Sequence, residues 1–400
     1  MKIIQINTVL GIGSTGRTCV ELESVLIDRD IESFIAFGYG SSVDRNHYQI
    51  GSKIDHYLHN ICSRIFGVQG FFSKRSTKKF IRYLRVLNPD IIHLRNLHGN
   101  YLNYELLFKY LNTLEIPVIW TLHDCWPYTG KCVHYTAVSC DKWKSQCENC
   151  PQIKKYPPSL FLDRSRTMYD KKKELFTSLK NGHILTVSDW LAKEVSLSYL
   201  NKYPIKRIYN WIDTETFTPL KDGSKLKVMS RSKFNVLGVS AGWNTGDSKL
   251  ADFISLSEML TSEYQIVLLG ALGRGVKLPN NIIHIPFVSS KKDLAKIYSE
   301  ADVYVHLSIE DTFGKVIAEA LSCGTPVIGY NSTAIPELFD KNCGFVVPVG
   351  NLKLVVDSIE VIRAKGKDYY SSYCVDYVND KFSYSKNSNQ IVEFYNSVMK

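Results

Sequence analysis

The sequence predicts an α/β protein with two doubly wound domains in tandem. Short β-branched runs alternate with segments of helical spacing along almost the whole chain, which is typical of parallel sheets covered by helices on both faces. The alternation stops once, in a turn-rich and charged segment at 207–227, and then restarts. A chain of 400 residues is also longer than a single hydrophobic core usually needs.

The first half of the chain contains several predicted strands. They share short runs of Ile, Val, Leu and aromatic residues, and segments of helical spacing follow most of them. The strands are expected at 2–9, 33–38, 90–96, 117–124 and 183–188. We therefore expect an N-terminal domain over residues 1–212, with a cysteine-rich insertion at 125–150.

The second half repeats the same pattern. Its strands are expected at 235–240, 265–270, 282–287, 302–308, 326–330 and 344–348. These runs predict a C-terminal domain over residues 213–380. A last helix, expected within residues 381–400, could pack back on the first domain.

Composition excludes several classes of protein. With 44% hydrophobic and 22% charged residues, and without low-complexity tracts, the chain is expected to be soluble and globular. It has no apolar run of about 18 residues that could span a bilayer. Its first residues contain Gln and Asn within the apolar stretch, unlike a signal peptide. We therefore expect a cytoplasmic protein, in which the 10 cysteines are mostly thiols or metal ligands.

The net charge of +10 is unevenly distributed. Residues 56–89 include no acid, whereas seven cations there alternate with phenylalanine and leucine. A helix in this segment places Lys78, Lys79, Arg82 and Arg85 largely on one side. One interpretation is that the segment lies on an anionic membrane surface, and the other is an ordinary solvated helix face.

A glycine-rich stretch, GIGSTG, follows the first predicted strand and precedes a predicted helix. Gly11, Gly13 and Gly16 fit the G-x-G-x-x-G pattern, in which backbone N–H groups hold a phosphate. A dinucleotide-dependent dehydrogenase would also need an acid at the end of the second strand. That strand, SFIAFGYG, ends in glycine. The dehydrogenase is therefore disfavoured, and the loop is expected to approach another ligand.

Cysteines are concentrated after the fourth predicted strand. Cys147 and Cys150 have the spacing of a zinc knuckle, and Cys132 and Cys140 would complete four ligands. Structural zinc, free thiols and disulfides all remain open. A basic zinc protein could bind nucleic acid, but no basic helix or RNA-binding signature accompanies the cluster, so nucleic acid is not an expected partner.

Polar residues follow two predicted strands. His123 and Asp124 come after PVIWTL, at a strand end where open α/β sheets bind ligands. Asp311 lies in the loop after another strand, and Glu319 lies two turns into the helix KVIAEALSCG. N–H groups at the start of that helix suit an anionic ligand. Because the neighbours of Glu319 are apolar, its carboxylate needs a polar partner.

The stretch at 311–327 resembles the signature of the family-four retaining glycosyltransferases. It has an acid, seven residues and a glutamate within F-G-x-x-x-x-E-A-x-x-C-G-x-P-V. The resemblance covers nearly the whole chain, because GIGSTGR, WTLHD, YNWIDTETF and VSSKKDLAKIYSEADVYVHLS are similar to other family segments. The run from HDCWPYTGKC to ENCP resembles an exopolysaccharide and capsule subgroup that includes colanic-acid-type enzymes.

The resemblance implies two Rossmann-like domains facing across a cleft. The implied activity is transfer of a hexose from a nucleotide-sugar to an acceptor hydroxyl, with retention of anomeric configuration. It implies no catalytic metal, and a lipid-linked or saccharide acceptor that a cytoplasmic enzyme could meet at the inner face of the membrane. Catalytic roles fall on His123, Asp311 and Glu319. Donor-side roles fall on Gly13, Ser14, Gly16, Arg17, Trp243, Asn244, Lys249, Phe287, Glu310, Thr312, Phe313, Gly314, Lys315 and Val316.

The chain departs from the family pattern in two places. Asp311 stands where the family usually has glutamate, although Glu310 is adjacent. An arginine that commonly holds the diphosphate has no counterpart near Gly246 and Asp247, which leaves Lys249 as the nearby cation. The alternative function is therefore a catalytically weak homologue that binds sugar nucleotide as a regulator or partner subunit.

Overall fold

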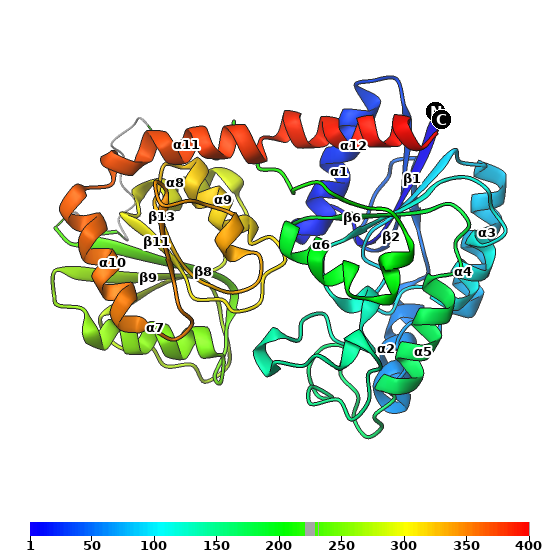
Figure 1. The fold of residues 1–400 in the computed structure, drawn as a ribbon, viewed down its shortest axis with the longest axis horizontal. Helices are drawn as coiled ribbons and strands as arrows, with labels where there is room; N and C mark the ends of the chain where they lie inside the picture. Colours follow the sequence, from blue (N-terminus) through cyan, green and yellow to red (C-terminus); the bar gives the residue numbers. More distant parts are fainter. Residues whose placement is uncertain (221–228, 231, 400) are drawn as a thin grey trace. The chain divides into compact units, whose positions relative to one another are not determined.

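The computed structural model describes residues 1–220, 229–230 and 232–399. These residues form two compact units (Figure 1). Unit 1 comprises Met1–Tyr209 together with the residues from Ser388 onward, and unit 2 comprises Asn210–Asn387. Part of the turn-rich segment expected at 207–227 lies outside the described residues, from 221 onward.

Unit 1 is built on a parallel sheet with the strand order β3-β2-β1-β4-β5-β6-β7. Its strands are β1 (Lys2–Val9), β2 (Glu32–Tyr39), β3 (His47–Gln49), β4 (Ile91–Leu94), β5 (Val118–Leu122), β6 (Gly182–Thr186) and β7 (Ile205–Arg207). The strands expected in the first half are confirmed. The edge strands β3 and β7 were not predicted, because three residues are too few to show a periodic pattern.

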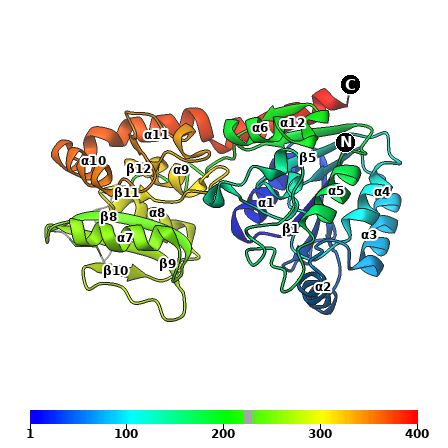
Figure 2. The same cartoon turned by 60° about the horizontal axis from the view of Figure 1, so that its bottom comes forward.

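The helices of unit 1 alternate with these strands. They are α1 (Gly13–Ile27), α2 (Lys53–Phe66), α3 (Lys74–Leu87), α4 (Tyr104–Leu111), α5 (Ser165–Phe176) and α6 (Asp189–Ser196), with short 3₁₀ turns at Trp126–Tyr128, Thr136–Val138, Lys142–Lys144 and Tyr199–Lys202. Figures 1 and 2 show α3, α4 and α5 gathered on one side of the sheet and α1 on the other. The sheet is therefore covered on both faces, as its continuously buried strands require.

Unit 2 repeats this architecture with the strand order β10-β9-β8-β11-β12-β13, again all parallel. The strands are β8 (Phe234–Trp243), β9 (Tyr264–Leu272), β10 (Ile282–Ile285), β11 (Val303–His306), β12 (Val327–Tyr330) and β13 (Gly344–Val347). The helices are α7 (Ser248–Met259), α8 (Lys291–Glu300), α9 (Lys315–Ser322), α10 (Leu352–Lys365) and α11 (Asp368–Phe382), with a 3₁₀ turn at Ile335–Glu337. The predicted class, α/β with two doubly wound sheets, is confirmed.

The last helix, α12 (Tyr384–Val398), begins in unit 2 and continues in unit 1. Within unit 1 the Tyr395 hydroxyl lies 2.6 Å from Nδ1 of the buried His93 on β4. Phe394 packs edge-on against His183 of β6, with 5.8 Å between ring centroids. Among the described residues, no helix combines the length and apolar composition that crossing a bilayer requires.

In each sheet, the strand order reverses between two central strands. The reversal lies between β1 and β4 in unit 1 and between β8 and β11 in unit 2. Chain connections leave the sheet in opposite directions at such a point, which opens a crevice beyond the carboxyl ends of the two strands. Ligand sites are therefore expected after β1 and β4, and after β8 and β11.

Candidate functional site

A cavity of about 250 Å³ lies at the carboxyl ends of β8 and β11 in unit 2. It occupies the place where the strand order reverses. The lining combines apolar walls with a few polar side chains, as in small-molecule sites. It consists of Val239, Ser240, Ala241, Trp243, Lys249, Phe253, Val305, His306, Leu307, Ser308, Glu310, Asp311 and Val316.

Lys249 and Ser240 form the β8 side of the cavity. The register of β8 against β9 shifts between Val239 and Gly242, and this irregularity contains Ser240. The Lys249 ammonium lies 2.5 Å from the Ser240 hydroxyl oxygen, to which it donates. It also stands 5.5 Å from the ring centroid of Trp243. The hydroxyl and the indole therefore hold one positive charge at the wall of the cavity.

Trp243 has a structural role as well as a place in the lining. Its indole N–H donates to the Leu269 carbonyl at 3.1 Å, and its ring packs edge-on against Phe253. The side chain is 1% exposed. The Trp243 ring is therefore a fixed part of the cavity wall and not a mobile surface for stacking.

A hydrogen-bonded chain of three residues forms the β11 side. The Tyr304 hydroxyl lies 2.7 Å from Nδ1 of His306, and Nε2 of His306 lies 2.8 Å from Oδ2 of Asp311. Burial raises the pKa of Tyr304 well above its usual value, so the phenol stays protonated and can donate to Nδ1. The imidazole proton then lies on Nε2 and is donated to Asp311. This chain fixes the Asp311 carboxylate at the cavity.

Helix α9 starts at the cavity and buries a carboxylate. Gly314, at the position before the helix, has φ of +61°, a conformation that favours glycine. Glu319 is 6% exposed, and the hydroxyl of Tyr298 on α8 donates to its Oε2 at 3.3 Å. The expectation that a carboxylate among apolar neighbours needs a partner is met by this contact. Glu319 does not belong to the cavity lining, whereas Val316, one turn earlier, does.

The structure brings together part of the predicted catalytic and donor-side residues. Trp243, Lys249, Glu310, Asp311 and Val316 line one cavity. Thr312, Gly314, Lys315 and Glu319 follow in the same loop and helix without lining it.

Other predicted donor-side residues lie apart from the lining. Both the backbone N–H and the side-chain amide of Asn244 donate to Asp247 Oδ2. Phe313 is buried, and its ring packs on that of Phe382 with centroids 5.4 Å apart. Phe287 is 62% exposed in the loop after β10.

The remaining predicted residues lie in unit 1, near the reversal of its own sheet. Gly13 is the first residue of α1, and Ser14, Gly16 and Arg17 follow within its first turns. A Cβ at Gly16 would stand 3.1 Å from both the Gly11 nitrogen and the Val9 side chain. A side chain at this position would require the end of β1 or the helix start to shift by a few tenths of an ångström. The glycine motif is thus explained in part by packing.

A buried arginine, which the sequence did not single out, contacts the predicted His123. Arg95 follows β4 and donates to Gln5 Oε1 at 3.0 Å and to Thr18 Oγ1 at 2.7 Å. Its guanidinium also lies 3.3 Å from Nε2 of His123, at the end of β5. The polar residues within otherwise apolar strands, Gln5 and His93, were the available signal for a buried polar cluster here.

Next to this cluster, His98 and Asp124 form a close pair. His98 Nε2 lies 2.7 Å from Asp124 Oδ2, and the Tyr156 hydroxyl lies 3.0 Å from Nδ1. Burial alone would raise the pKa of Asp124, but the charge and hydrogen bond of His98 and the N–H of Trp126 outweigh it and lower the pKa. The carboxyl ends of β4 and β5 therefore carry two adjoining polar groups.

The four cysteines expected to bind zinc line one small cavity, with room for about 20 Å³. The sulfurs of Cys132 and Cys150 are 3.9 Å apart. The Gly130 N–H donates to the Cys147 sulfur at 3.2 Å. None of the 10 cysteines, all of which lie among the described residues, forms a disulfide. In the described part of the chain, no three His, Cys, Asp or Glu side chains are already grouped as a metal site.

Two lysines, the half-buried Lys131 and the buried Lys172, organise this insertion. The Lys131 ammonium donates to the carbonyls of Gln152, Ile153 and Lys155 at 2.8 to 3.0 Å. Lys172 is fully buried and donates to the carbonyls of Trp126 and Thr129. Burial lowers the pKa of both lysines. Backbone carbonyls therefore satisfy both ammonium groups.

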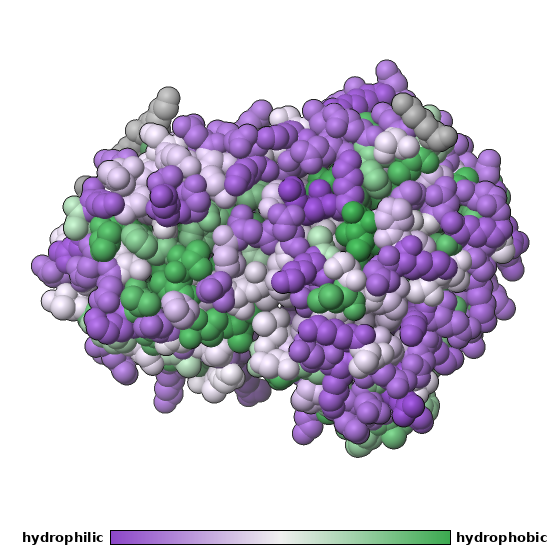
Figure 3. Space-filling view, in the orientation of Figure 1, coloured by the Kyte–Doolittle hydropathy of each residue, from purple (hydrophilic) through white to green (hydrophobic). Residues whose placement is uncertain are grey.

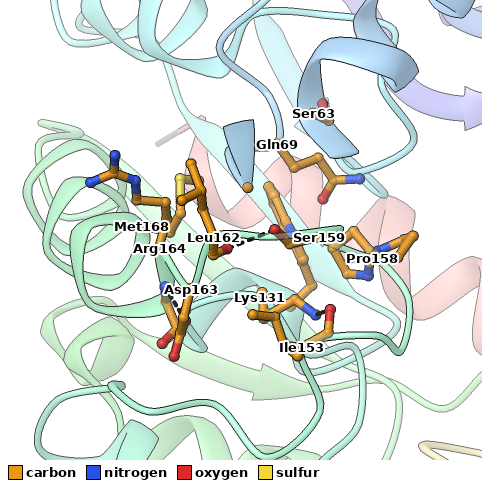
Figure 4. Close-up of a pocket in the computed structure, with 15 residues that line it drawn as sticks. Ser63, Gln69, Lys131, Ile153, Pro158, Ser159, Leu162, Asp163, Arg164 and Met168 are labelled. Carbon is orange, nitrogen blue, oxygen red and sulfur yellow. Dashed lines mark hydrogen bonds between the residues drawn. The ribbon is translucent and has the colours of Figure 1, made fainter. Parts of the chain in front are cut away.

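A second small cavity lies beside Lys131 (Figure 4). The figure shows the Arg164 guanidinium pointing away from Lys131, and the Ser159 hydroxyl hydrogen-bonded to the Leu162 carbonyl. Its free space of about 20 Å³ suits a single water molecule. This cavity is therefore too small for a sugar or nucleotide.

Two protein-family models match the chain. Residues 15–216 match the model described as Glycosyltransferase Family 4, and residues 265–369 match Glycosyl transferases group 1. The chain is 23% identical over 365 residues to WcaC of Escherichia coli, named as a colanic acid biosynthesis glycosyl transferase, and the match covers 87% of each protein. It is 28% identical to the O-antigen chain mannosyltransferase B of Escherichia coli, over 53% of this chain and 55% of that protein.

Solved structures share the fold. A glycosyltransferase from Rickettsia africae superposes with a TM-score of 0.70 at 17% identity, covering 100% of this chain and 98% of that one. HepE of Anabaena, solved in complex with UDP, superposes with a TM-score of 0.67 at 14% identity, covering 99% and 100%. The first family model alone spans just over half of the 400 residues. The chain belongs to glycosyltransferase family 4.

Proposed function

We propose that the enzyme transfers a hexose from a nucleotide-sugar to an acceptor hydroxyl during synthesis of an extracellular polysaccharide or capsule, with retention of the anomeric configuration. The observation that carries the proposal is the unit 2 cavity, where Lys249 and the His306–Asp311 pair stand together at the reversal of the sheet. HepE, which shares the fold, was solved with UDP and with UDP-glucose, and WcaC is named for colanic acid synthesis.

Lys249 and Asp311 of the lining, together with Glu319 on α9, have roles in this proposal. Lys249 and the N–H groups at the start of α9 stabilise the negative charge that develops on the departing diphosphate. Asp311, held by His306, contacts the donor sugar. Glu319 accepts hydrogen bonds from the ribose hydroxyls. The proposal includes no side-chain nucleophile, because the acceptor attacks the same face of the sugar from which the leaving group departs. It also includes no catalytic metal.

Residues of unit 1 are assigned to the acceptor side and to donor contacts. Arg95 donates to Nε2 of His123, which places the imidazole proton on Nδ1 and orients the ring. His123 then contacts the transferred sugar, and the glycine loop with Ser14 and Arg17 approaches the donor. The acceptor in this proposal is lipid-linked or a saccharide, and the enzyme acts in the cytoplasm at the inner face of the membrane.

A second function, a sugar-nucleotide-binding protein with little activity, is favoured by the composition of the lining. No arginine lines the cavity among the described residues, although the diphosphate of a donor carries two phosphates to be matched. Such a protein would act as a regulator or partner subunit. It would bind nucleotide-sugar without consuming it.

One experiment separates the two functions. The purified protein is incubated with a panel of nucleotide-sugars and a saccharide acceptor extract, and release of nucleoside diphosphate is measured alongside binding. Release with one donor supports the transferase. Tight binding of a donor without release supports the regulator. If the protein shows no binding and no release, both functions are contradicted.

Substitutions of Asp311 test its proposed contact with the donor sugar. Asp311→Asn should lower kcat by about tenfold and leave nucleoside diphosphate affinity nearly unchanged, because the lost charge-assisted hydrogen bond is to the sugar, at roughly 1.5 kcal/mol. Asp311→Glu should retain most activity. Steady-state kinetics and calorimetry with the diphosphate measure the two effects. A drop in diphosphate affinity that matches the drop in kcat would move Asp311 to the phosphate side.

We further propose that Cys132, Cys140, Cys147 and Cys150 hold one structural zinc. Tetrahedral Zn–S bonds of about 2.3 Å place thiolates about 3.8 Å apart, and the Cys132 and Cys150 sulfurs stand at 3.9 Å. Thiolate is the form of cysteine that binds metal. Cys140 and Cys147, which line the same small cavity, would supply the other two ligands.

Elemental analysis of protein purified without added metal tests the zinc. We expect about one zinc per chain, lost in Cys147→Ser and retained in Cys62→Ser, whose half-buried cysteine lies outside the cluster. Chelation should expose four thiols and lower the thermal unfolding temperature. Zinc near zero in the parent, with four titratable thiols, would exclude the site.

A further inference from the structure

Helix α2 has its apolar side chains on the outside. Ile54 is 71% exposed, Tyr57 65% and Leu58 53%, and Ile65 and Phe66 at the end of the helix are exposed as well. Their spacing of three, four and seven residues places most of them on one side of the helix. A surface helix of a globular protein normally turns such a stripe toward the core.

The buried side of α2 is polar, and each polar group there has a partner. His56 Nε2 lies 2.7 Å from the Ile50 carbonyl, and the Ser63 hydroxyl donates to Asn100 at 3.0 Å. His59 accepts the Gly70 N–H at Nε2, which leaves the Nδ1 proton for Ser73. Burial lowers the pKa of His59 to about 3, so this histidine is neutral. These bonds fix the rotation of the helix and hold its apolar side outward.

The apolar surface continues beyond the helix. The Leu160 N–H donates to the Arg64 carbonyl at 2.9 Å, which places 160–162 beside the end of α2. Phe161 in this segment is 77% exposed, and Leu160 is exposed as well. Figure 3 shows hydrophobic atoms at the lower end of unit 1, where Figure 1 draws the end of α2. We call Ile54, Tyr57, Leu58, Ile65, Phe66 and Phe161 the apolar face.

Exposed cations lie on α2 and on the helix that follows it. Arg64 lies on α2, and α3 follows after seven residues with a buried side of Ser76, Thr77, Phe80 and Leu84. Its other side exposes Lys74, Arg75, Lys78, Lys79, Arg82 and Arg85. No ion pair among the described residues involves any of these seven cations. The chain provides no acid between residues 56 and 89 to neutralise them.

We propose that the apolar face and the cations of α3 form a surface that docks unit 1 on an anionic lipid bilayer. The apolar side chains insert at the boundary between headgroups and acyl chains, and the cations bind the lipid phosphates. The positive charge selects this occupant, because a neutral or basic protein partner would leave seven cations unmatched. The surface is separate from the unit 2 cavity, and the inference does not depend on the proposed transfer.

Vesicle co-sedimentation of the full chain tests the docking. The parent should bind vesicles of phosphatidylcholine with phosphatidylserine, bind pure phosphatidylcholine far less, and lose affinity as salt rises. Lys78→Gln with Lys79→Gln should weaken binding by about 25-fold, taking each cation as about fivefold. The matched control is Lys292→Gln with Lys341→Gln, which removes the same charge from exposed lysines of unit 2 and should change binding by less than about twofold.

The contribution of the apolar face is tested separately, with its own control. Ile54→Ser with Leu58→Ser should weaken binding by at least about tenfold. Ile27→Ser with Leu197→Ser removes an isoleucine and a leucine of similar exposure from α1 and the end of α6 and should have little effect. All variants change exposed side chains, so thermal unfolding should be unaltered.

Several outcomes would overturn the inference: no binding of the parent, equal binding to both vesicle types, or equal loss in test and control variants. A dimer that dissociates in the Ile54 and Leu58 variant, without vesicle binding, would assign the face to a second copy of the chain. Nucleoside diphosphate binding is measured on the same samples. If docking fails while that binding persists, the proposed transfer is unaffected, and the reverse result leaves the docking surface standing.

Discussion

Replacing Glu319 by glutamine is expected to weaken nucleoside diphosphate binding by about ten- to a hundredfold. Glu319 is buried on α9, eight residues after the Asp311 carboxylate of the cavity. A carboxylate accepts two ribose hydroxyl hydrogen bonds at roughly 1.5 to 3 kcal/mol each, whereas a glutamine of the same shape loses the charge and offers one acceptor oxygen. Calorimetry with nucleoside diphosphates measures the change, and the protein should remain folded.

Tyr298→Phe is the control that separates binding from structure. The Tyr298 hydroxyl donates to Glu319, so a purely structural glutamate would be disturbed by either substitution. We expect Tyr298→Phe to lower the free energy of unfolding by about 1 kcal/mol and to leave diphosphate affinity within a fewfold of the parent. If Glu319→Gln binds the diphosphate as tightly as the parent, or if both variants lose affinity equally, then Glu319 is not a ribose ligand.

The fold could be predicted because its strands are buried on both faces. A central parallel strand such as β4 or β11 is a continuous apolar run, and such runs are visible in one sequence. The edge strands β3 and β7 are three residues long and partly exposed, so no periodicity marks them. Their pairing is decided by neighbouring strands far away in the sequence.

The site could be predicted where it is local in sequence. Asp311 and Glu319 stand on one loop and helix, so their spacing alone relates them. His306 and Ser240 were missed because their importance arises from contacts that tertiary structure creates, His306 with Tyr304 and Asp311, and Ser240 with Lys249. The sequence offered one hint, a histidine ending an otherwise apolar buried strand.

The outward apolar stripe of α2 shows a different limit. Its helical period is plain in the sequence, but the period does not say which side faces the core. The hydrogen bonds of His56, His59 and Ser63 settle that direction, and they depend on Ile50, Gly70, Ser73 and Asn100 from other segments. A pattern-based analysis would assign the apolar side to the core.

Replacing Lys249 by glutamine is expected to lower kcat by about a hundredfold or more, the largest single effect at the cavity. Its ammonium is fixed by the Ser240 hydroxyl at 2.5 Å and by the Trp243 ring, so its position is set before a donor arrives. Charge on the diphosphate grows as the bond to the sugar breaks. A fixed cation therefore lowers the transition-state free energy more than that of the bound donor.

Comparison of kcat with donor affinity decides this role. Glutamine should reduce diphosphate affinity only severalfold while kcat falls about a hundredfold, and Lys249→Arg should restore part of the rate because it keeps the charge. Ser240→Ala, which removes the hydroxyl that holds the ammonium, should lower kcat by about tenfold without abolishing it. Lys292→Gln, an exposed lysine outside the lining, is the control and should behave as the parent.

Equal losses in kcat/KM and in affinity, with kcat unchanged, would mean that Lys249 binds ground state and transition state alike. Full activity of Lys249→Gln would show that Lys249 has no role in the reaction. Its charge would then not compensate for the absence of an arginine from the lining.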